Sequence, residues 1–187
     1  MLNRCLGLLV VALAWGGMIH TASAEHERWY EWQGVHFGVS AERLMGIDLT
    51  DPEGPNNSSV RARFLYNGDV AVPTSIARAG FDVFIHRFSI GVAGGVATHD
   101  NAIINPRFGY LWGLTPQLGL WFRAGAFYAK AGPAEWLGFN GEVLFAYFPY
   151  PVVAFHVGPT IDLAVGQGRT ANYANFGLPQ LGMSAFF

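Results

Sequence analysis

In several segments of the sequence, small and large residues alternate. Nine ionisable side chains share the alternate positions, or parity, of the small residues. Four are carboxylates, three are guanidiniums and two are imidazoles: Glu42, Asp82, Glu142, Asp162, Arg78, Arg107, Arg123, His36 and His156. Neutral polar residues share this parity, among them Ser40, Asn105, Asn140, Thr160, Gln180 and Ser184. Opposite charges that are held away from water pair with one another. The pattern therefore predicts a network of paired charges, and a gated path for small solutes or protons is the alternative use of the same groups.

Nucleophilic catalysis is a second chemistry to consider, and it needs a serine, a histidine base and an acid within reach of one another. The one available set places Ser58 or Ser59 in one polar segment and His99-Asp100 in another. The apolar positions of residues 117–128 and 152–166 supply none of these groups. We assign no catalytic residue. The two histidines on the charged parity lack the spacing of paired metal ligands, so we expect no metal and no cofactor.

The elements that must position these charges are clearest in residues 75–97. Large apolar residues occupy every second position on both sides of His86-Arg87, which is the pattern of two antiparallel strands joined by a tight turn. The opposite positions carry mainly glycine, alanine and serine, together with Arg78 and Asp82. A soluble sheet would show the reverse, with charges toward water and large apolar residues in the core. The hairpin is inside out, as the wall of a membrane-spanning barrel should be.

Alternating segments recur along the chain, and we count eight strands. Their expected ranges are 33–49, 75–85, 88–97, 103–112, 117–128, 136–148, 152–166 and 173–187. Tight turns are expected at 86–87, 113–116 and 149–151, and longer loops at 50–73, 98–102, 129–135 and 166–173. An even number of strands, with short turns on one side and loops on the other, is typical of outer-membrane barrels. The sequence leaves open an additional hairpin at residues 59–66.

Composition also indicates a surface that does not face water. Charged residues make up 13% of the chain and Lys130 is its single lysine, although soluble domains cover themselves with lysine and glutamate. No segment after residue 24 is apolar for long enough to form a spanning helix, which leaves a closed barrel as the structure that satisfies its own backbone in lipid. Aromatic residues gather near both expected ends of the strands, as interfacial girdles do.

Residues 1–24 have the three-part organisation of a cleaved secretory signal. Arg4 comes first, an apolar run from Leu6 to Ile19 follows, and Ala22-Ser23-Ala24 ends the segment. We therefore expect a mature domain of residues 25–187. Cleavage would remove the only cysteine, Cys5, and would change the formal net charge from −2 to −3 because Arg4 is lost. This acidic balance argues against nucleic acid as a partner.

A resemblance to known proteins points the same way. The alternating strands and the terminal segment Gly182–Phe187 (GMSAFF) resemble the small eight-stranded outer-membrane barrels of Gram-negative bacteria. Segments of uncharacterised myxobacterial barrels are similar to residues 37–46 (FGVSAERLMG), 79–84 (AGFDVF) and 156–162 (HVGPTID). The resemblance implies a monomer in the bacterial outer membrane, with both termini periplasmic and with outer-membrane lipid and lipopolysaccharide around it. It also implies that the outer-membrane assembly machinery reads Phe187.

The expected function is a structural one, or binding through the extracellular loops, because eight strands leave an interior that side chains can just fill. A narrow pore for small solutes is one alternative. A lipid A acyl hydrolase or acyl transferase is another, since some eight-stranded barrels have these activities. A secreted, lipocalin-like soluble barrel is a third. The shared parity of Arg107, Arg123 and Glu142 with small residues argues against the soluble barrel.

The same parity leads to expectations that a structure can test. We expect two buried groups within salt-bridge reach, one of Glu42 and Arg78 and one of Arg107, Arg123 and Glu142. Val157 is expected near mid-membrane on the lipid face and Gly158 in the lumen. Val157→Arg should then be strongly destabilising, and Gly158→Ser should be the milder change.

Overall fold

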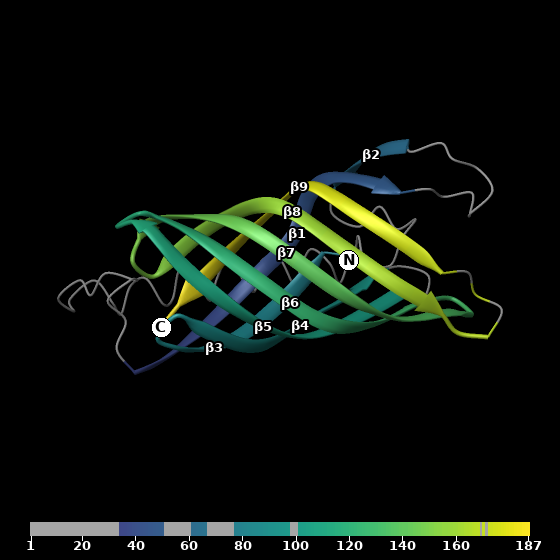
Figure 1. The fold of residues 1–187 in the computed structure, drawn as a ribbon, viewed down its shortest axis with the longest axis horizontal. Coiled ribbons are helices and arrows are strands. Elements are labelled where there is room, and N and C mark those ends of the chain that lie inside the picture. Colours follow the sequence, from purple (N-terminus) through teal and green to yellow (C-terminus); the bar gives the residue numbers. More distant parts are fainter. Residues whose placement is uncertain (1–33, 51–60, 67–76, 98–100, 169, 171) are drawn as a thin grey trace.

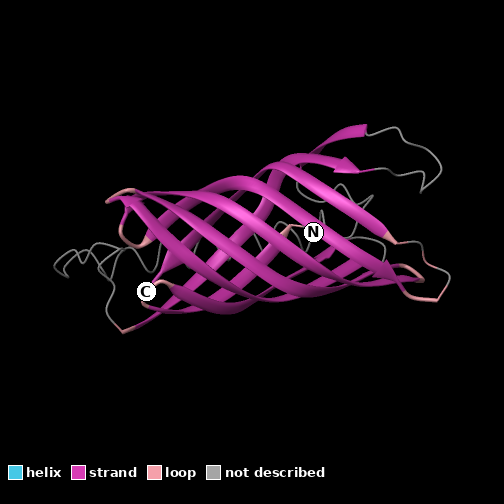
Figure 2. Cartoon of the chain, in the orientation of Figure 1, coloured by secondary structure: helices cyan, strands magenta, loops and turns pink. Residues whose placement is uncertain are grey.

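A computed structural model describes residues 34–50, 61–66, 77–97, 101–168, 170 and 172–187 of the chain. All regular secondary structure in these residues is β-strand, and the strands wrap around a long barrel at a steep tilt (Figure 1, Figure 2). The all-β class predicted from the alternation is confirmed. No helix in the described part of the chain is long and apolar enough to cross a membrane.

Nine strands make up the sheet in the residues that the structure describes, and eight of them close the barrel. Their bounds are β1 (Val35–Thr50), β2 (Arg61–Tyr66), β3 (Arg78–Ile85), β4 (Phe88–Ala97), β5 (Asn101–Thr115), β6 (Leu118–Ala131), β7 (Ala134–Tyr150), β8 (Val153–Gly166) and β9 (Tyr173–Phe186). Neighbours from β3 to β9 pair antiparallel, and β1 pairs with both β3 and β9. At this closure Phe37 and Phe187 exchange two backbone hydrogen bonds of 2.8 and 2.9 Å. The predicted eight-stranded antiparallel barrel is therefore confirmed.

The ninth strand, β2, pairs with Met45–Thr50 of β1. Figure 1 shows β2 beside the end of β1, above the other strands in this view, at one end of the barrel. Residues 61–66 thus form the additional hairpin partner that the sequence left open.

Three tight turns define what we call the turn end of the barrel, and the opposite end is the loop end. The turn at His86-Arg87 is confirmed by the pairing of Ile85 with Phe88, and His86 takes a left-handed φ of 57° there. The other two turns lie at residues 116–117 and 151–152, slightly later than predicted, because β5 and β7 continue to Thr115 and Tyr150.

One connection at the loop end differs from the prediction. Residues 129–135 were expected to form a longer loop, but β6 and β7 remain paired as far as Ala131 and Ala134. Only Gly132 and Pro133 join them, and Gly132 has a φ of 55°, which glycine adopts without strain. The prediction of a longer loop was wrong because Gly132 and Pro133 alone reverse the chain as a two-residue turn.

Buried inward side chains lie in three layers along the barrel. An apolar layer at the turn end consists of Phe84, Leu111, Trp121, Leu144, Ala146, Phe148, Ala154 and Phe186. A smaller apolar cluster at the loop end consists of Ile103, Phe127, Ala129 and Ala164, with Trp136 packed against it. Buried charged residues lie between the two, as the order Trp121, Arg123, Phe127 along β6 illustrates. We call the turn-end cluster the aromatic layer.

The outer face of the barrel is apolar. On β7 the exposed large apolar residues run from Leu137 to Tyr147 and include Tyr150 next to the turn, and on β8 they run from Phe155 to Val165. Phe139, on this outer face, is 72% exposed, whereas Glu142 on the inner face is 4% exposed. Midway along the barrel, charged side chains therefore lie inside and large apolar residues lie outside, the reverse of a soluble protein.

Candidate functional site

A continuous set of ion pairs fills the middle of the lumen. Seven side chains alternate in sign across it, in the order Asp82, Arg107, Glu42, Arg123, Glu142, Arg43 and Asp162. None of the seven is more than 4% exposed. We call these seven residues the charge network.

Arg107 connects three strands at one end of this network. Its Nη1 donates to Oε2 of Glu42 on β1 at 2.6 Å, while Nε and Nη2 donate to the two carboxylate oxygens of Asp82 on β3 at 3.0 and 2.5 Å. The planar guanidinium matches the two oxygens of a carboxylate, so the pair with Asp82 fixes both distance and orientation. Ser40 adds a hydrogen bond from its hydroxyl to Oε1 of Glu42 at 2.6 Å.

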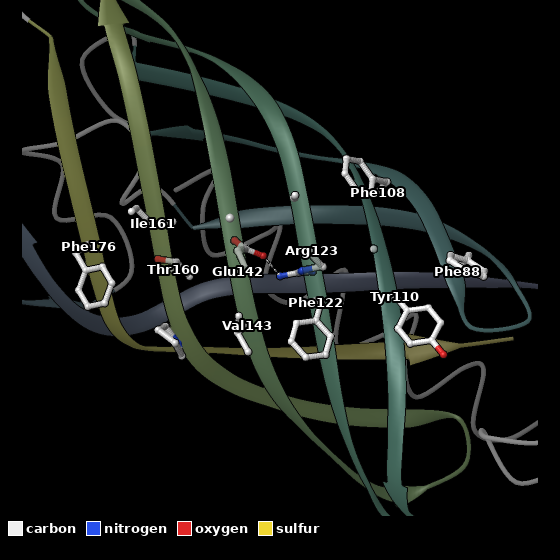
Figure 3. Close-up of a pocket in the computed structure, with 14 residues that line it drawn as sticks. Phe88, Phe108, Tyr110, Phe122, Arg123, Glu142, Val143, Thr160, Ile161 and Phe176 are labelled. Atoms are coloured by element: carbon white, nitrogen blue, oxygen red, sulfur yellow. Dashed lines mark ion pairs between the residues drawn. The ribbon is translucent and has the colours of Figure 1, made fainter.

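Arg123 occupies the centre of the network. Its Nη1 donates to Oε1 of Glu42 at 2.6 Å, and its Nη2 pairs with Oε2 of Glu142, the neighbour on β7 seen in Figure 3. The guanidinium carbon also lies 4.5 Å from the ring centroid of Trp121, a cation–π distance. Arg123 therefore joins the charge network to the aromatic layer.

Asp162 forms the other end of the network and accepts four hydrogen bonds. Arg43 donates to its two oxygens at 2.7 and 3.0 Å, and the side-chain amides of Asn140 and Asn175 donate at 2.6 and 3.3 Å. Arg43 also lies 3.4 Å from Glu142 and so links Asp162 to the rest of the network. The contacts to Asp162 thus connect β1, β7, β8 and β9.

Arg43 is the one network residue that the sequence analysis missed. Regular alternation would turn it to the outside, because Glu42 before it faces the lumen. Arg43 instead has a φ of 51°, and the register between β1 and β9 shifts between Ala41 and Met45. Such a bulge lets two consecutive residues point to the same side. The available signal was an arginine on the lipid-facing parity, which is costly in a membrane and should have suggested a bulge.

The structure also changes the expected grouping of charges. Glu42 and Arg78 are paired positions on β1 and β3 and both are buried, but the hydrogen bonds to Glu42 described above come from Arg107, Arg123 and Ser40. Arg78 donates to Oδ1 of Asn105 at 3.2 Å. Glu42 therefore joins the second expected group, because it is shared by the guanidiniums of Arg107 and Arg123. With Arg78 included, the buried charges described comprise four carboxylates and four guanidiniums, so their formal charges cancel.

The two histidines predicted for the network lie outside it. His156 is buried beside the aromatic layer, where its Nε2 is 3.1 Å from the hydroxyl of Ser184 and its ring packs edge-on against Trp121 at 5.8 Å. His36 is half-buried near the turn end. In the described part of the chain, no group of three or more His, Cys, Asp and Glu residues is placed to hold a metal ion.

Inward glycines provide the space that the network needs. A Cβ on Gly80 would lie 2.6 Å from Nη2 of Arg107, and one on Gly91 would overlap Oδ1 of Asp82. A Cβ added at Gly158 would meet the backbone oxygen of Val143 instead of an open polar lumen, which contradicts the expectation for this residue. A serine at Gly158 would therefore require that backbone to shift, so the reason for expecting a mild change was wrong.

The alternative catalytic set cannot be placed in this geometry. Ser58, Ser59, His99 and Asp100 lie outside the described residues. Within the lumen, the carboxylates of the charge network are held by guanidiniums and side-chain amides. The chemistry of this arrangement is therefore cross-linking of the barrel wall by ion pairs.

No protein-family model and no curated protein matches the chain. Four chains of solved structures are similar to it, among them the following two. One is Ail, the attachment invasion locus protein of Yersinia pestis, with 7% identity and a TM-score of 0.46, covering 83% of this chain and 100% of that one. The other is Neisserial surface protein A (NspA), with 12% identity and a TM-score of 0.49, covering 82% of this chain and 97% of that one. The barrel assignment rests on the strand pairing and not on these two similarities.

Proposed function

We propose that this protein is an integral outer-membrane β-barrel of a Gram-negative bacterium, with a structural role or a binding role carried by its loop end. In this proposal the charge network closes the lumen. The protein catalyses no reaction and does not conduct solutes.

The observation that carries the proposal is the apolar belt on a closed barrel. On β7 the belt covers Leu137–Tyr147, with Tyr150 exposed beyond it next to the turn, and on β8 it covers Phe155–Val165. Eleven residues on each strand correspond to the roughly 9–11 residues that a tilted strand needs to cross a bilayer. A closed barrel leaves no unpaired edge within that belt, which is the requirement for strands in lipid.

The filled lumen supports a role other than transport. An eight-stranded barrel has an interior about wide enough for its own side chains. Here that interior contains the charge network between two apolar clusters, and each network residue is almost fully buried. A solute path would require at least one ion pair of the network to break.

The proposal also covers location and partners. Residues 1–24 serve as the export signal, both termini lie in the periplasm, and the turn end faces that compartment. Lipopolysaccharide and other outer-membrane lipids surround the belt of a monomeric barrel, and Phe187 is read by the assembly machinery. Kinship with the uncharacterised myxobacterial barrels belongs to the same proposal.

Membrane insertion is tested by flotation. Purified protein is refolded in the presence of phospholipid vesicles and centrifuged through a density gradient. We expect the folded protein to rise with the vesicles and to stay with them after washing at alkaline pH. A folded protein that remains in the aqueous fraction would contradict the membrane assignment and favour the soluble barrel.

Orientation is tested with single cysteines in the mature chain, which would otherwise contain none. Pro133→Cys lies in the β6–β7 turn at the loop end, and Gln117→Cys, the matched control, lies in the turn at the opposite end. A maleimide that cannot cross membranes should label Pro133→Cys in intact cells and should label Gln117→Cys only after the outer membrane is permeabilised. The opposite labelling would mean that the barrel is inverted.

Conduction is tested in planar bilayers. A lumen closed by the network should give no stable single-channel current from the purified wild-type protein. Reproducible, ion-selective current steps would contradict the closed lumen and favour a narrow pore.

A further inference from the structure

Two adjoining hollows lie on the outer face of the barrel, over β5 to β8. Their volumes are about 540 and 630 Å³, and both are bordered by Phe108, Ala124, Gly141 and Ile161. Because these four residues are common to both, the hollows form one depression in the apolar belt. We call it the outer hollow.

Strand register explains why the outer hollow exists. Successive pairings align one row of outward residues across six strands: Ile90, Phe108, Ala124, Gly141, Ile161 and Phe176. The two central residues, Ala124 and Gly141, are small, and the residues on both sides are large. Phe122 and Phe139 add walls along β6 and β7, as Figure 3 shows for Phe122.

The position of the hollow restricts what can enter it. It lies directly outside the charge network, since Arg123 and Glu142 are the chain neighbours of Ala124 and Gly141. Those two polar side chains are buried and paired with each other in the lumen, so the surface of the hollow is apolar. A polar group placed there would be buried without a hydrogen-bond partner. The occupant must therefore be hydrocarbon.

The width of the hollow distinguishes between kinds of hydrocarbon surface. Phe108 on β5 and Phe139 on β7 are two strand spacings apart, roughly 10 Å between backbones, and their rings narrow this further. An α-helix with side chains is about 10–12 Å across and does not fit. A second copy of the barrel would present a wall broader than the space between Phe108 and Phe139, which cannot enter the hollow. We propose that the outer hollow holds one acyl chain of a membrane lipid, an inference that rests on the proposed membrane location.

The test uses a phospholipid with a photoreactive diazirine near the middle of its acyl chain. Wild-type protein is refolded into vesicles containing this lipid, irradiated, and mapped by peptide mass spectrometry. We expect several-fold more adducts on the β5–β7 residues around the hollow than on the outward residues of β1 and β3, such as Val39 and Phe81. Even labelling of both faces would overturn the acyl-chain site.

The second arm of this experiment fills the outer hollow with a larger side chain. Ala124→Phe should lower the labelling of β5–β7 to the level of β1 and β3, whereas Ala185→Phe, the same change elsewhere on the outer face, should leave it unchanged. If Ala124→Phe does not fold, Gly141→Val replaces it, because a Cβ there meets only Ile161, at 3.2 Å. Undiminished labelling in the filled variant overturns the site. Protein that floats with vesicles but labels evenly refutes this site alone, whereas protein that does not float refutes the proposed function.

Discussion

Glu142 and Leu144 are consecutive inward residues of β7, yet they belong to regions of the lumen that are held together differently. Glu142 is part of the charge network, where it pairs with Arg43 and Arg123. Leu144 is part of the aromatic layer, in van der Waals contact with rings and aliphatic side chains. Both are almost fully buried, at 4% and 2% exposure. The two regions show that a narrow lumen can be filled either by directional pairs or by packing alone.

The difference determines how each region responds to change. An ion pair in a dry interior is worth little compared with an apolar filling, but removing one partner leaves a buried charge without compensation. Apolar packing has no such directional requirement, so a side chain of similar volume is tolerated. The charge network should therefore be sensitive to the identity of each group, and the aromatic layer mainly to its volume.

Glu142→Gln should have the largest effect, because it keeps the shape and removes the charge that Arg43 and Arg123 share. We expect a loss of about 3–5 kcal/mol in the free energy of unfolding. Urea titration of protein refolded into lipid vesicles measures it. Glu135→Gln, the same change on β7 outside the network, is the control and should fall within about 0.5 kcal/mol of wild type. An unchanged midpoint for Glu142→Gln would mean that water enters the network.

A charge placed on the outer face tests whether that face of the barrel contacts lipid. Val157 pairs with the exposed residues Phe145 and Leu181, so it belongs to the apolar belt. Val157→Arg should lose about 2–4 kcal/mol, the penalty for a lipid-facing arginine near the bilayer centre. Leu114→Arg, on the outer face next to a turn, is the control and should lose about 0–1 kcal/mol. If Val157→Arg and Leu114→Arg lost the same free energy of unfolding, Val157 would not lie deeper in the bilayer than Leu114.

Most of the fold could be predicted from the sequence because parity in a strand is a local property. Each residue faces the side opposite to its neighbours, so the charges at Asp82, Arg107, Arg123 and Glu142 were enough to define an inner face. Strand ends were less predictable, since Thr115 and Ala134 lie in turn-like sequences but remain paired in the ladder. Turn residues indicate where a chain is able to reverse, but the pairing decides where it does.

The partners within the network could not be predicted in the same way. They depend on which strands face each other across the lumen, and parity contains no information about that distance. Arg107 reaches Glu42, which is 65 residues away in the chain, and Arg43 reaches Asp162, which is 119 residues away. The bulge at Arg43 was also hidden, because a single left-handed residue reverses the parity on which the prediction depended.

Asn105 makes a third kind of inner contact, in which a side chain replaces a missing backbone hydrogen bond between two strands. Pro106 has no N–H to donate, and the pairing of β5 with β6 is interrupted at residues 105–106. The Nδ2 of Asn105 donates instead to the backbone oxygen of Ala126 at 2.7 Å. Asn105→Ala should therefore cost about 1–3 kcal/mol, the penalty for a buried acceptor left without a donor.

The Pro106→Ala background separates the loss of this replacement hydrogen bond from the other effects of Asn105→Ala. With alanine at 106, a backbone N–H becomes available to the β6 strand, so Asn105→Ala should cost less there than in the wild-type background. The difference between the two costs, from urea titrations of all four proteins, is the coupling between the residues. Equal costs would show that Asn105 acts through its other contacts, the hydrogen bond from Arg78 and its long hydrogen bond to the backbone oxygen of Pro106.

Leu144→Met should have the smallest effect and completes the comparison with Glu142. Methionine has nearly the volume of leucine and adapts its shape, so the aromatic layer should lose less than about 1.5 kcal/mol. Urea titration of this variant beside Glu142→Gln compares two near-isosteric changes, two residues apart on the same face of β7. If Leu144→Met lost as much free energy of unfolding as Glu142→Gln, both layers would depend on precise shape. Ion pairing would then not set the charge network apart from the aromatic layer.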